Sequence, residues 1–278
     1  MINKHQYTDT WSDELSKILA SAHDAADIAR AAILPHFRKS VEVANKSSAS
    51  NFDPVTIADK NAEIAIRAYI EKAWPAHGFV GEETGTVRED APVQWIVDPI
   101  DGTRSFIIGS PLWGTLIGVV IDGVPRLGIL DQAYTGERFY VENGKTFLTH
   151  NDTSRPQQLT TRTCRKLEDA VLMTTHPDHF ASDQDLKCFF DLKKRVRLSR
   201  YGGDCYSYGL LAAGFVDLVV ETGLHPYDIV ALIPIVEMAG GCVTTWDGEP
   251  ATRGGQIIAA GDPALHELAL DVLQHART

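Results

Sequence analysis

Two aspartates at the end of one predicted strand restrict the folds and functions open to this chain more than any other feature. The apolar run Trp95–Val97 is typical of a strand, and it leads into Asp98 and, three residues later, Asp101. The Gly-Thr pair that follows has the turn and capping chemistry with which a helix begins. Two carboxylates with a carbonyl between them suit a divalent cation such as Mg²⁺, and amides at a helix start suit a phosphate. If the Asp-x-x-Asp pair stood alone, the two residues would be structural caps of a strand and a helix. The choice between such caps and a metal site therefore depends on the rest of the chain.

Further acidic residues occur at the ends of other predicted elements. Glu82 follows a short apolar run sixteen residues before Asp98, and Asp228 comes directly before an apolar helical pattern. Asp59 lies in the first turn of another predicted helix. Its spacing from Thr56 also matches a capping box, which gives Asp59 a purely structural alternative. The recurrence of acids at such positions favours a shared site over isolated caps.

The order and residues of these motifs resemble the inositol monophosphatase family of Mg²⁺-dependent, lithium-sensitive phosphatases. The resemblance extends from about Asp53 to Gly241, and its most specific part is the segment Asp98–Thr103. It implies an α/β layered sandwich (αβαβα) with a catalytic cleft between an N-terminal and a C-terminal half. It also implies a phosphoric monoester hydrolase that acts on a small phosphorylated substrate.

Three segments are similar to the branch of that family that dephosphorylates histidinol phosphate: Asp101–Ile107, Tyr201–Tyr206 and Gly223–Asp228. Typical inositol monophosphatases tend to have a Thr-Asn pair where this chain has Arg104-Ser105. The resemblance therefore favours histidinol phosphatase activity in histidine biosynthesis. Because a few pocket residues can set substrate preference, inositol 1-phosphate or a broad range of sugar and nucleotide phosphates is the alternative. An interaction protein is the alternative from another class, since some bacterial relatives serve in transcription complexes.

The resemblance implies two or three Mg²⁺ ions in each active site. One ion would have Glu82 among its ligands, a second would have Asp228, and both would share Asp98. Asp59 would orient a water or assist a third ion, and Thr103 would hydrogen-bond the attacking water, with Glu82 and Asp59 nearby to receive its proton. The full set of expected ligands is Glu82, Asp98, the carbonyl of Ile100, Asp101 and Asp228.

The expected substrate-binding residues lie near the start of the helix after Asp101 and in the second half of the chain. Amides at this helix start would hold phosphate oxygens, and Arg104 is either an extra phosphate contact or an exposed helix cation. Acids facing the leaving group would pair with the ammonium of histidinol or accept hydroxyls of inositol. Asp204 has a helix N-cap as its structural alternative, and His176 and His179 are predicted surface residues. The set is Gly102, Thr103, Arg104, Asp204 and Glu221.

The hydrophobic patterns divide the chain into two halves, 1–150 and 151–278. The first half has helical patterns from Trp11 and over 57–73, followed by strands joined at the hairpin signals Asp122-Gly123 and Asn143-Gly144. These predict N-terminal helices on an antiparallel sheet. In the second half, strands and helices alternate, including one helix near 227–238, which predicts a mixed sheet.

Composition limits the partners and the compartment. The net charge of −11 over 278 residues argues against a nucleic-acid binder, which would usually be basic. The sequence has no apolar stretch of about 18 residues and no apolar signal core at its start, so we expect neither a membrane span nor secretion. Four scattered cysteines fit reduced thiols in a cytoplasmic protein. A homodimer is the default expectation from the family resemblance.

Overall fold

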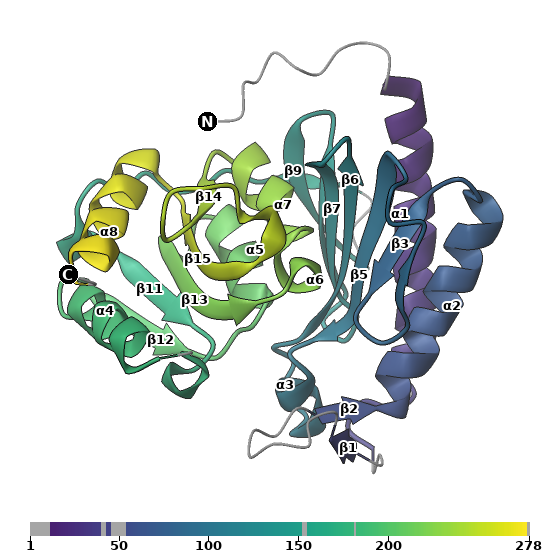
Figure 1. The fold of residues 1–278 in the computed structure, drawn as a ribbon, viewed down its shortest axis with the longest axis horizontal. Coiled ribbons are helices and arrows are strands. Elements are labelled where there is room, and N and C mark those ends of the chain that lie inside the picture. The colour runs from purple at the N-terminus through teal and green to yellow at the C-terminus, as the bar shows by residue number, and fades with distance from the viewer. Residues whose placement is uncertain (1–11, 40–42, 46–53, 152–154, 181, 277–278) are drawn as a thin grey trace.

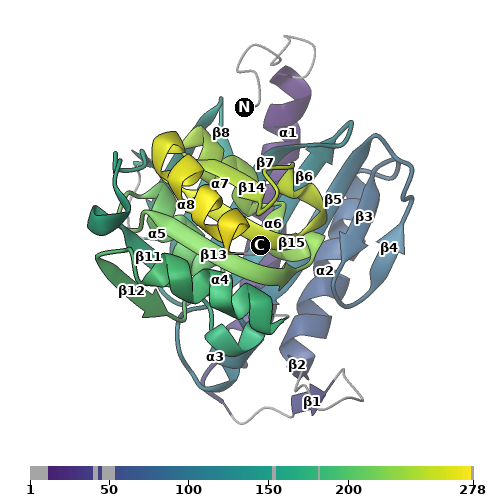
Figure 2. The same ribbon diagram turned by 60° about the vertical axis from the view of Figure 1, so that its left-hand side comes forward.

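The structure of the protein is a computed structural model, and it describes residues 12–39, 43–45, 54–151, 155–180 and 182–276. Helices and sheets alternate in five layers across the molecule (Figures 1 and 2). This arrangement confirms the predicted αβαβα sandwich. It also places the short helix α3 (Thr103–Ile107) and the ends of several strands of both sheets beside one another.

The first layer contains two long helices, and the second is a sheet of eight strands within the described residues. Helices α1 (Ser12–Ile33) and α2 (Ile57–Ala73) cover one face of this sheet (Figure 1). The strand order is β10-β9-β8-β7-β6-β5-β3-β4, and the pairs are antiparallel except for the parallel pair of β3 and β5. The strands are β3 Gly78–Gly81, β4 Gly85–Val87, β5 Val93–Asp101, β6 Gly114–Ile121, β7 Val124–Gln132, β8 Glu137–Glu142, β9 Lys145–His150 and β10 Gln157–Gln158. A small antiparallel pair, β1 (Val43–Asn45) and β2 (Pro54–Thr56), precedes α2.

Both predicted hairpins are confirmed. Asp122 and Gly123 join β6 to β7 with φ of 50° and 77°, and Asn143 and Gly144 join β8 to β9 with φ of 49° and 68°. A two-residue turn with positive φ at both positions matches the twist of antiparallel strands, and Asp-Gly and Asn-Gly adopt it most easily. Local turn chemistry therefore fixes the registers of β6 with β7 and of β8 with β9.

The second sheet is mixed, as predicted. Its order is β12-β11-β13-β15-β14; β11 is parallel to both neighbours, whereas β15 is antiparallel to β13 and β14. Helices α4 and α8 cover its outer face, and α5, α6 and α7 lie between the two sheets (Figures 1 and 2). The elements are β11 Val171–Thr174, α4 Asp183–Lys193, β12 Leu198–Tyr201, α5 Tyr206–Ala212, β13 Leu218–Leu224, α6 Pro226–Ile229, α7 Leu232–Met238, β14 Cys242–Thr245, β15 Gly255–Ala260 and α8 Pro263–His275, with a short helix α3 (Thr103–Ile107) after β5.

Three buried apolar clusters fill the spaces between the layers. The first joins α1 and α2 to the first sheet around Trp95 and Trp113. The second fills the space between the sheets and contains Phe139. The third, with Phe189 and Trp246, packs α4 and α8 on the second sheet. Each sheet is thus apolar on both faces, which accounts for fully buried strands such as β6.

The prediction of one continuous helix near 227–238 is wrong, because the segment forms α6 and α7 with a turn at Val230 and Ala231. Pro234 explains the break. Proline has no backbone N–H to donate to the carbonyl four residues earlier, and its ring clashes with that carbonyl in a regular helix.

The turn between α6 and α7 packs directly on the first sheet. Gly118 and Gly128 are opposite one another on β6 and β7. A Cβ at Gly128 would lie 1.9 Å from the Ala231 carbonyl oxygen, and one at Gly118 would lie 2.8 Å from Val230 Cγ1. The two glycines therefore let the turn approach closely, and this approach sets the position of α6, which carries Asp228.

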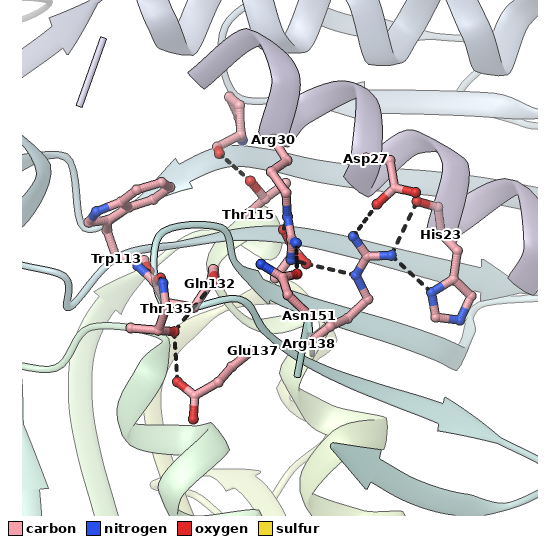
Figure 3. A network of polar contacts seen from close by, with 12 residues as sticks. His23, Asp27, Arg30, Trp113, Thr115, Gln132, Thr135, Glu137, Arg138 and Asn151 are labelled. Carbon is pink, nitrogen blue, oxygen red and sulfur yellow. Dashed lines mark hydrogen bonds and ion pairs between the residues drawn. The ribbon is translucent and has the colours of Figure 1, made fainter. Parts of the chain in front are cut away.

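Helix α1 is held on the sheet by a buried charge network (Figure 3). The carboxylate of Asp131 is fully buried and accepts hydrogen bonds from Arg30 at 2.7 and 3.1 Å and from Arg138 at 2.7 Å. Arg138 also donates to Asp27 of α1 at 2.6 Å. A buried carboxylate is tolerated only when it is paired in this way.

No helix of the described chain is long and apolar enough to cross a membrane. We retain the two halves, 1–150 and 151–278, as a proposed division, although β10 at Gln157–Gln158 still belongs to the first sheet.

Candidate active site

The parallel pairing of β3 and β5 brings Glu82 next to Asp98. Along this pair, Phe79 is opposite Trp95 and Gly81 is opposite Val97, a constant offset of sixteen residues. Glu82 continues the pairing, since its amide donates to the Val97 carbonyl at 3.3 Å. The sixteen-residue spacing in the sequence is therefore the register of this strand pair.

The end of β5 is irregular, and the irregularity exposes its carbonyl and carboxylate groups to one site. The pairing with β6 shifts between Asp98 and Asp101. Asp98 Oδ1 accepts a hydrogen bond from the Ile100 amide at 2.9 Å, and Thr115 Oγ1 donates to the Pro99 carbonyl at 2.8 Å. Figure 3 shows Thr115 in the network of polar contacts near this end of the sheet. These bonds fix the turn that separates the two aspartates.

Helix α3 begins directly after the second aspartate, as predicted. Gly102 takes a left-handed φ of 86°, which costs a glycine little, and the helix starts at Thr103. Thr103 Oγ1 lies 3.0 Å from the carbonyl oxygen of Ile100 and 3.4 Å from Asp59 Oδ1. The hydroxyl of Thr103 thus lies between a carbonyl and a carboxylate of the proposed site.

Asp59 forms the capping box considered from the sequence, and its other carboxylate oxygen faces the proposed site. Its Oδ2 accepts hydrogen bonds from the amide and the hydroxyl of Thr56 at 2.9 and 2.5 Å, which completes the capping box of α2. Its Oδ1 faces Thr103. Burial is the main factor that raises the pKa of Asp59, and the charge of Glu82 adds to it. The cap therefore orients a carboxylate whose pKa is raised by its burial.

Asp228 reaches the site from the C-terminal half. It is the third residue of α6, and its Oδ2 accepts a hydrogen bond from the amide of His225 at 2.6 Å. Oxygens of Asp98, Asp101 and Asp228 all lie within 4.8 Å of one another. The structure thus brings together three of the expected metal ligands from two distant parts of the chain.

The electrostatics of this cluster favour a bound cation. Burial raises the pKa of Asp98 well above the usual range, and the charges of Glu82, Asp101 and Asp228 raise it further. Burial and the charges of Asp204 and Asp228 do the same for Asp101. An all-oxygen donor set of converging carboxylates, with the Ile100 carbonyl beside it, fits Mg²⁺, whose charge would relieve this repulsion.

Asp204 lies next to Gly102, since a Cβ at Gly102 would be 3.1 Å from Asp204 Cγ. Its backbone takes a left-handed φ of 43° after two glycines, and its Oδ2 accepts a hydrogen bond from Ser105 Oγ at 3.0 Å. The N-cap of α5 is Cys205, so Asp204 does not cap that helix. The Cys205 amide donates to Asp101 Oδ2 at 2.7 Å. The segment with Asp204 therefore also orients a proposed metal ligand.

Glu221 is buried in the middle of β13 and holds the loop after β11. Its carboxylate accepts hydrogen bonds from the amide and hydroxyl of Thr175 at 2.7 and 3.0 Å, and from Thr174 Oγ1 at 3.2 Å. Burial raises the pKa of Glu221 to about 8. Through these hydrogen bonds Glu221 positions Thr174 and Thr175, in addition to any contact that it makes with substrate.

Arg104 is exposed on α3, and its guanidinium donates to the imidazole of His179 from the other half of the chain. Contact with substrate through Arg104 and through the amides of Gly102 and Thr103 remains a prediction.

Glu63 is a structural contributor that the sequence analysis missed. It is fully buried, and its carboxylate accepts hydrogen bonds from the amides of Glu83 and Thr84 at 2.8 and 2.5 Å. A Cβ at Gly81 would lie 2.2 Å from Glu63 Oε1, so the glycine makes room for this carboxylate. The signal was present, because Glu63 is four residues after Asp59 and on the same face of the predicted helix.

Comparisons with known proteins show the family of this chain. A model of the inositol monophosphatase family matches residues 14–278. The chain is 41% identical over 273 residues to "Bifunctional phosphatase IMPL2, chloroplastic" of Arabidopsis thaliana, covering 94% of this chain and 76% of that protein. It is 34% identical over 217 residues to a "Histidinol-phosphatase" of Mycobacterium tuberculosis, covering 78% and 83%.

A solved structure has the same fold. The structure of an inositol monophosphatase from Zymomonas mobilis matches with a TM-score of 0.83 and 40% identity, covering 96% of this chain and 100% of that one. The family model spans nearly the whole chain, and the named relatives are phosphatases. This chain therefore belongs to the inositol monophosphatase family and is a phosphoric monoester hydrolase.

Proposed function

We propose that the protein is a Mg²⁺-dependent phosphatase that hydrolyses histidinol phosphate to histidinol and phosphate in histidine biosynthesis. The observation that carries the hydrolytic part is the convergence of Asp98, Asp101 and Asp228, whose oxygens lie within 4.8 Å of one another. The substrate is supported by the three segments that resemble the histidinol-phosphatase branch, and by the name of the relative from Mycobacterium tuberculosis.

The acidic cluster would hold two or three Mg²⁺ ions. One ion would be bound by Glu82, Asp98 and the Ile100 carbonyl. A second ion would be bound by Asp98, Asp101 and Asp228, so Asp98 would be a ligand of both. Bound Mg²⁺ neutralises phosphate charge and lowers the pKa of water, which is the chemistry that hydrolysis of a phosphate monoester requires.

The residues beside the cluster position water and accept its proton. Thr103 Oγ1 lies 3.4 Å from Asp59 Oδ1, so a water that donates to Thr103 would be close to a carboxylate. The raised pKa of Asp59 makes it a better proton acceptor than an exposed aspartate. Glu82, next to Asp98 in register, is the second acceptor.

The start of α3 would bind the phosphate. The amides of Gly102 and Thr103 would hold phosphate oxygens, with Arg104 as an additional cation at the rim. Gly102 permits this approach because its left-handed backbone carries no side chain, and a Cβ there would lie 3.1 Å from Asp204 Cγ.

Asp204 is the better of two candidates for pairing with the ammonium of histidinol. Burial raises its pKa to about 6, so in the metal-free protein the carboxylate is still mainly ionised at neutral pH. Glu221, with a pKa of about 8, is mainly protonated under the same conditions. A charged carboxylate close to the leaving group favours a cationic amino alcohol over a neutral polyol.

Inositol 1-phosphate is the second candidate substrate. It is favoured by the similarity to the inositol monophosphatase structure from Zymomonas mobilis. For the physiological setting we propose a cytoplasmic homodimer that binds a small phosphorylated substrate and neither nucleic acid nor membrane.

A phosphate-release assay tests the proposal. The panel contains histidinol phosphate, inositol 1-phosphate, adenosine 3′,5′-bisphosphate and fructose 1,6-bisphosphate, each with Mg²⁺ and after exhaustive chelation. We expect release from histidinol phosphate that disappears on chelation and returns with Mg²⁺. Full activity after chelation contradicts the metal dependence, and no release from histidinol phosphate contradicts the substrate.

A further inference from the structure

We propose that His179 is a positioning residue for the active site: it accepts a hydrogen bond from Arg104 and fixes this guanidinium beside the residues proposed to bind phosphate. The contact joins the two halves of the chain, since Arg104 is on α3 and His179 ends the 3₁₀ turn Pro177–His179 after β11. The inference rests on the proposed function, because Arg104 follows directly after the residues proposed to bind phosphate.

The chemistry of the two side chains determines the direction of the bond. Arginine only donates hydrogen bonds, so Nε2 of His179, which faces Arg104 Nη1, must be the acceptor. A neutral imidazole that accepts at Nε2 carries its hydrogen on Nδ1. Partial burial, the charge of Arg104 and the neighbouring His176 all lower the pKa of His179, which favours this neutral form.

The turn that carries His179 is itself held in place from two other segments. Thr222 Oγ1, next to Glu221 on β13, donates to the His179 carbonyl at 3.2 Å. The ring of His176, the N-cap of the turn, lies 6.0 Å from that of His179 and 6.3 Å from that of Tyr201 on β12. The imidazole of His179 is therefore presented by a turn that other segments support.

The position of Arg104 matters because of the charges around it. Its charge lowers the pKa of Asp204, which burial otherwise raises, so the guanidinium acts on the carboxylate proposed to pair with the substrate ammonium. A guanidinium held by His179 meets an incoming phosphate with its positive charge in one orientation. This reduces the side-chain entropy lost when substrate binds. Loss of the contact should weaken substrate binding more than it slows turnover.

The tautomer of His179 gives a direct test that does not depend on activity. Long-range ¹H–¹⁵N spectra of the full chain at neutral pH should show one imidazole with its hydrogen on Nδ1, absent from the spectrum of His179→Gln. In Arg104→Met, which keeps the length of the side chain but removes its donors, this imidazole should change its tautomer. A hydrogen on Nε2 in the unmodified protein overturns the proposal.

Kinetics test the effect on binding. We expect His179→Ala to raise KM roughly 3- to 10-fold, more than kcat falls, and His179→Gln to restore most of the loss, since its amide oxygen still accepts a hydrogen bond. In an Arg104→Met background, His179→Ala should have no further effect on KM. Asp183→Asn is the matched control, because Asp183 is an exposed acid at the start of α4 that has no part in the contact, and its KM should not change.

Two results overturn the inference: an unchanged KM in His179→Ala, or the same rise in KM with and without Arg104. The comparison is made with every panel substrate that is hydrolysed. If histidinol phosphate is not a substrate, the proposed function fails while the coupling of Arg104 and His179 is still measured on another phosphomonoester.

Discussion

Glu82 lies beside Asp98 because β3 and β5 are parallel neighbours with a constant offset of sixteen residues. This relationship connects the sequence spacing to the site, since two strand ends deliver two carboxylates to one place. Helix α6 then brings Asp228 to within 4.8 Å of Asp98 and Asp101. We therefore expect substitutions of single residues in this cluster and around it to have specific effects on activity and stability.

Asp101→Asn should reduce turnover at least about a hundredfold while the protein remains folded. The amide keeps the shape of the side chain and can still accept the hydrogen bond from Cys205, but it lacks the charge needed to hold Mg²⁺. Steady-state phosphate release at saturating Mg²⁺ measures the loss, and circular dichroism checks the fold. Asp122→Asn, in the turn between β6 and β7, is the control and should retain full activity. Turnover of Asp101→Asn within about threefold of the unmodified enzyme would contradict the assigned role.

Asp131→Ala should lower the free energy of unfolding by about 3–5 kcal/mol, because it leaves Arg30 and Arg138 without their buried partner. Asp191→Ala, which removes a surface ion pair with Lys194, should change the free energy of unfolding far less. Urea unfolding of both variants measures the difference. Equal small losses would show that the buried network does not stabilise α1 on the sheet.

Glu221→Gln should become more stable relative to the unmodified protein as pH rises. The pKa of Glu221 is about 8 in the folded protein and 4.5 for an ordinary glutamate, so the folded state holds this proton more tightly than the unfolded state. The stability associated with this proton is complete below pH 4.5 and is lost as pH rises toward 8. Urea unfolding of the metal-free proteins across this range measures the effect. A stability difference that does not change with pH would contradict the raised pKa.

Local signals predicted much of the fold. The helix expected over 57–73 has those bounds in the structure, because its Thr56 cap and Pro75 stop are encoded nearby. The two-residue hairpins are local for the same reason. The helix expected near 227–238 is interrupted at Val230 and Ala231, because Pro234 cannot donate the backbone hydrogen bond that a continuous helix requires.

The site was less accessible to sequence reasoning where contacts depend on tertiary structure. The resemblance identified Asp98, Asp101 and Asp228, and the structure brings these together. The helical spacing of Glu63 from Asp59 placed both on one face of a helix, but it did not show that Glu63 would hold the loop after β3. No local pattern indicated that His179 would contact Arg104 from 75 residues away. Such partners are set by how the two halves pack, which hydrophobic periodicity does not specify.

The most direct test of the central claim is the ratio of kcat/KM for histidinol phosphate to that for inositol 1-phosphate, measured at neutral pH with saturating Mg²⁺. The account predicts a ratio above one in the unmodified enzyme. It also predicts that the ratio falls about 10- to 150-fold in Asp204→Asn, the loss expected for a charge-assisted hydrogen bond to the substrate ammonium. A ratio below one in the unmodified enzyme would contradict the proposed substrate, and equal losses on both substrates would contradict the pairing with Asp204.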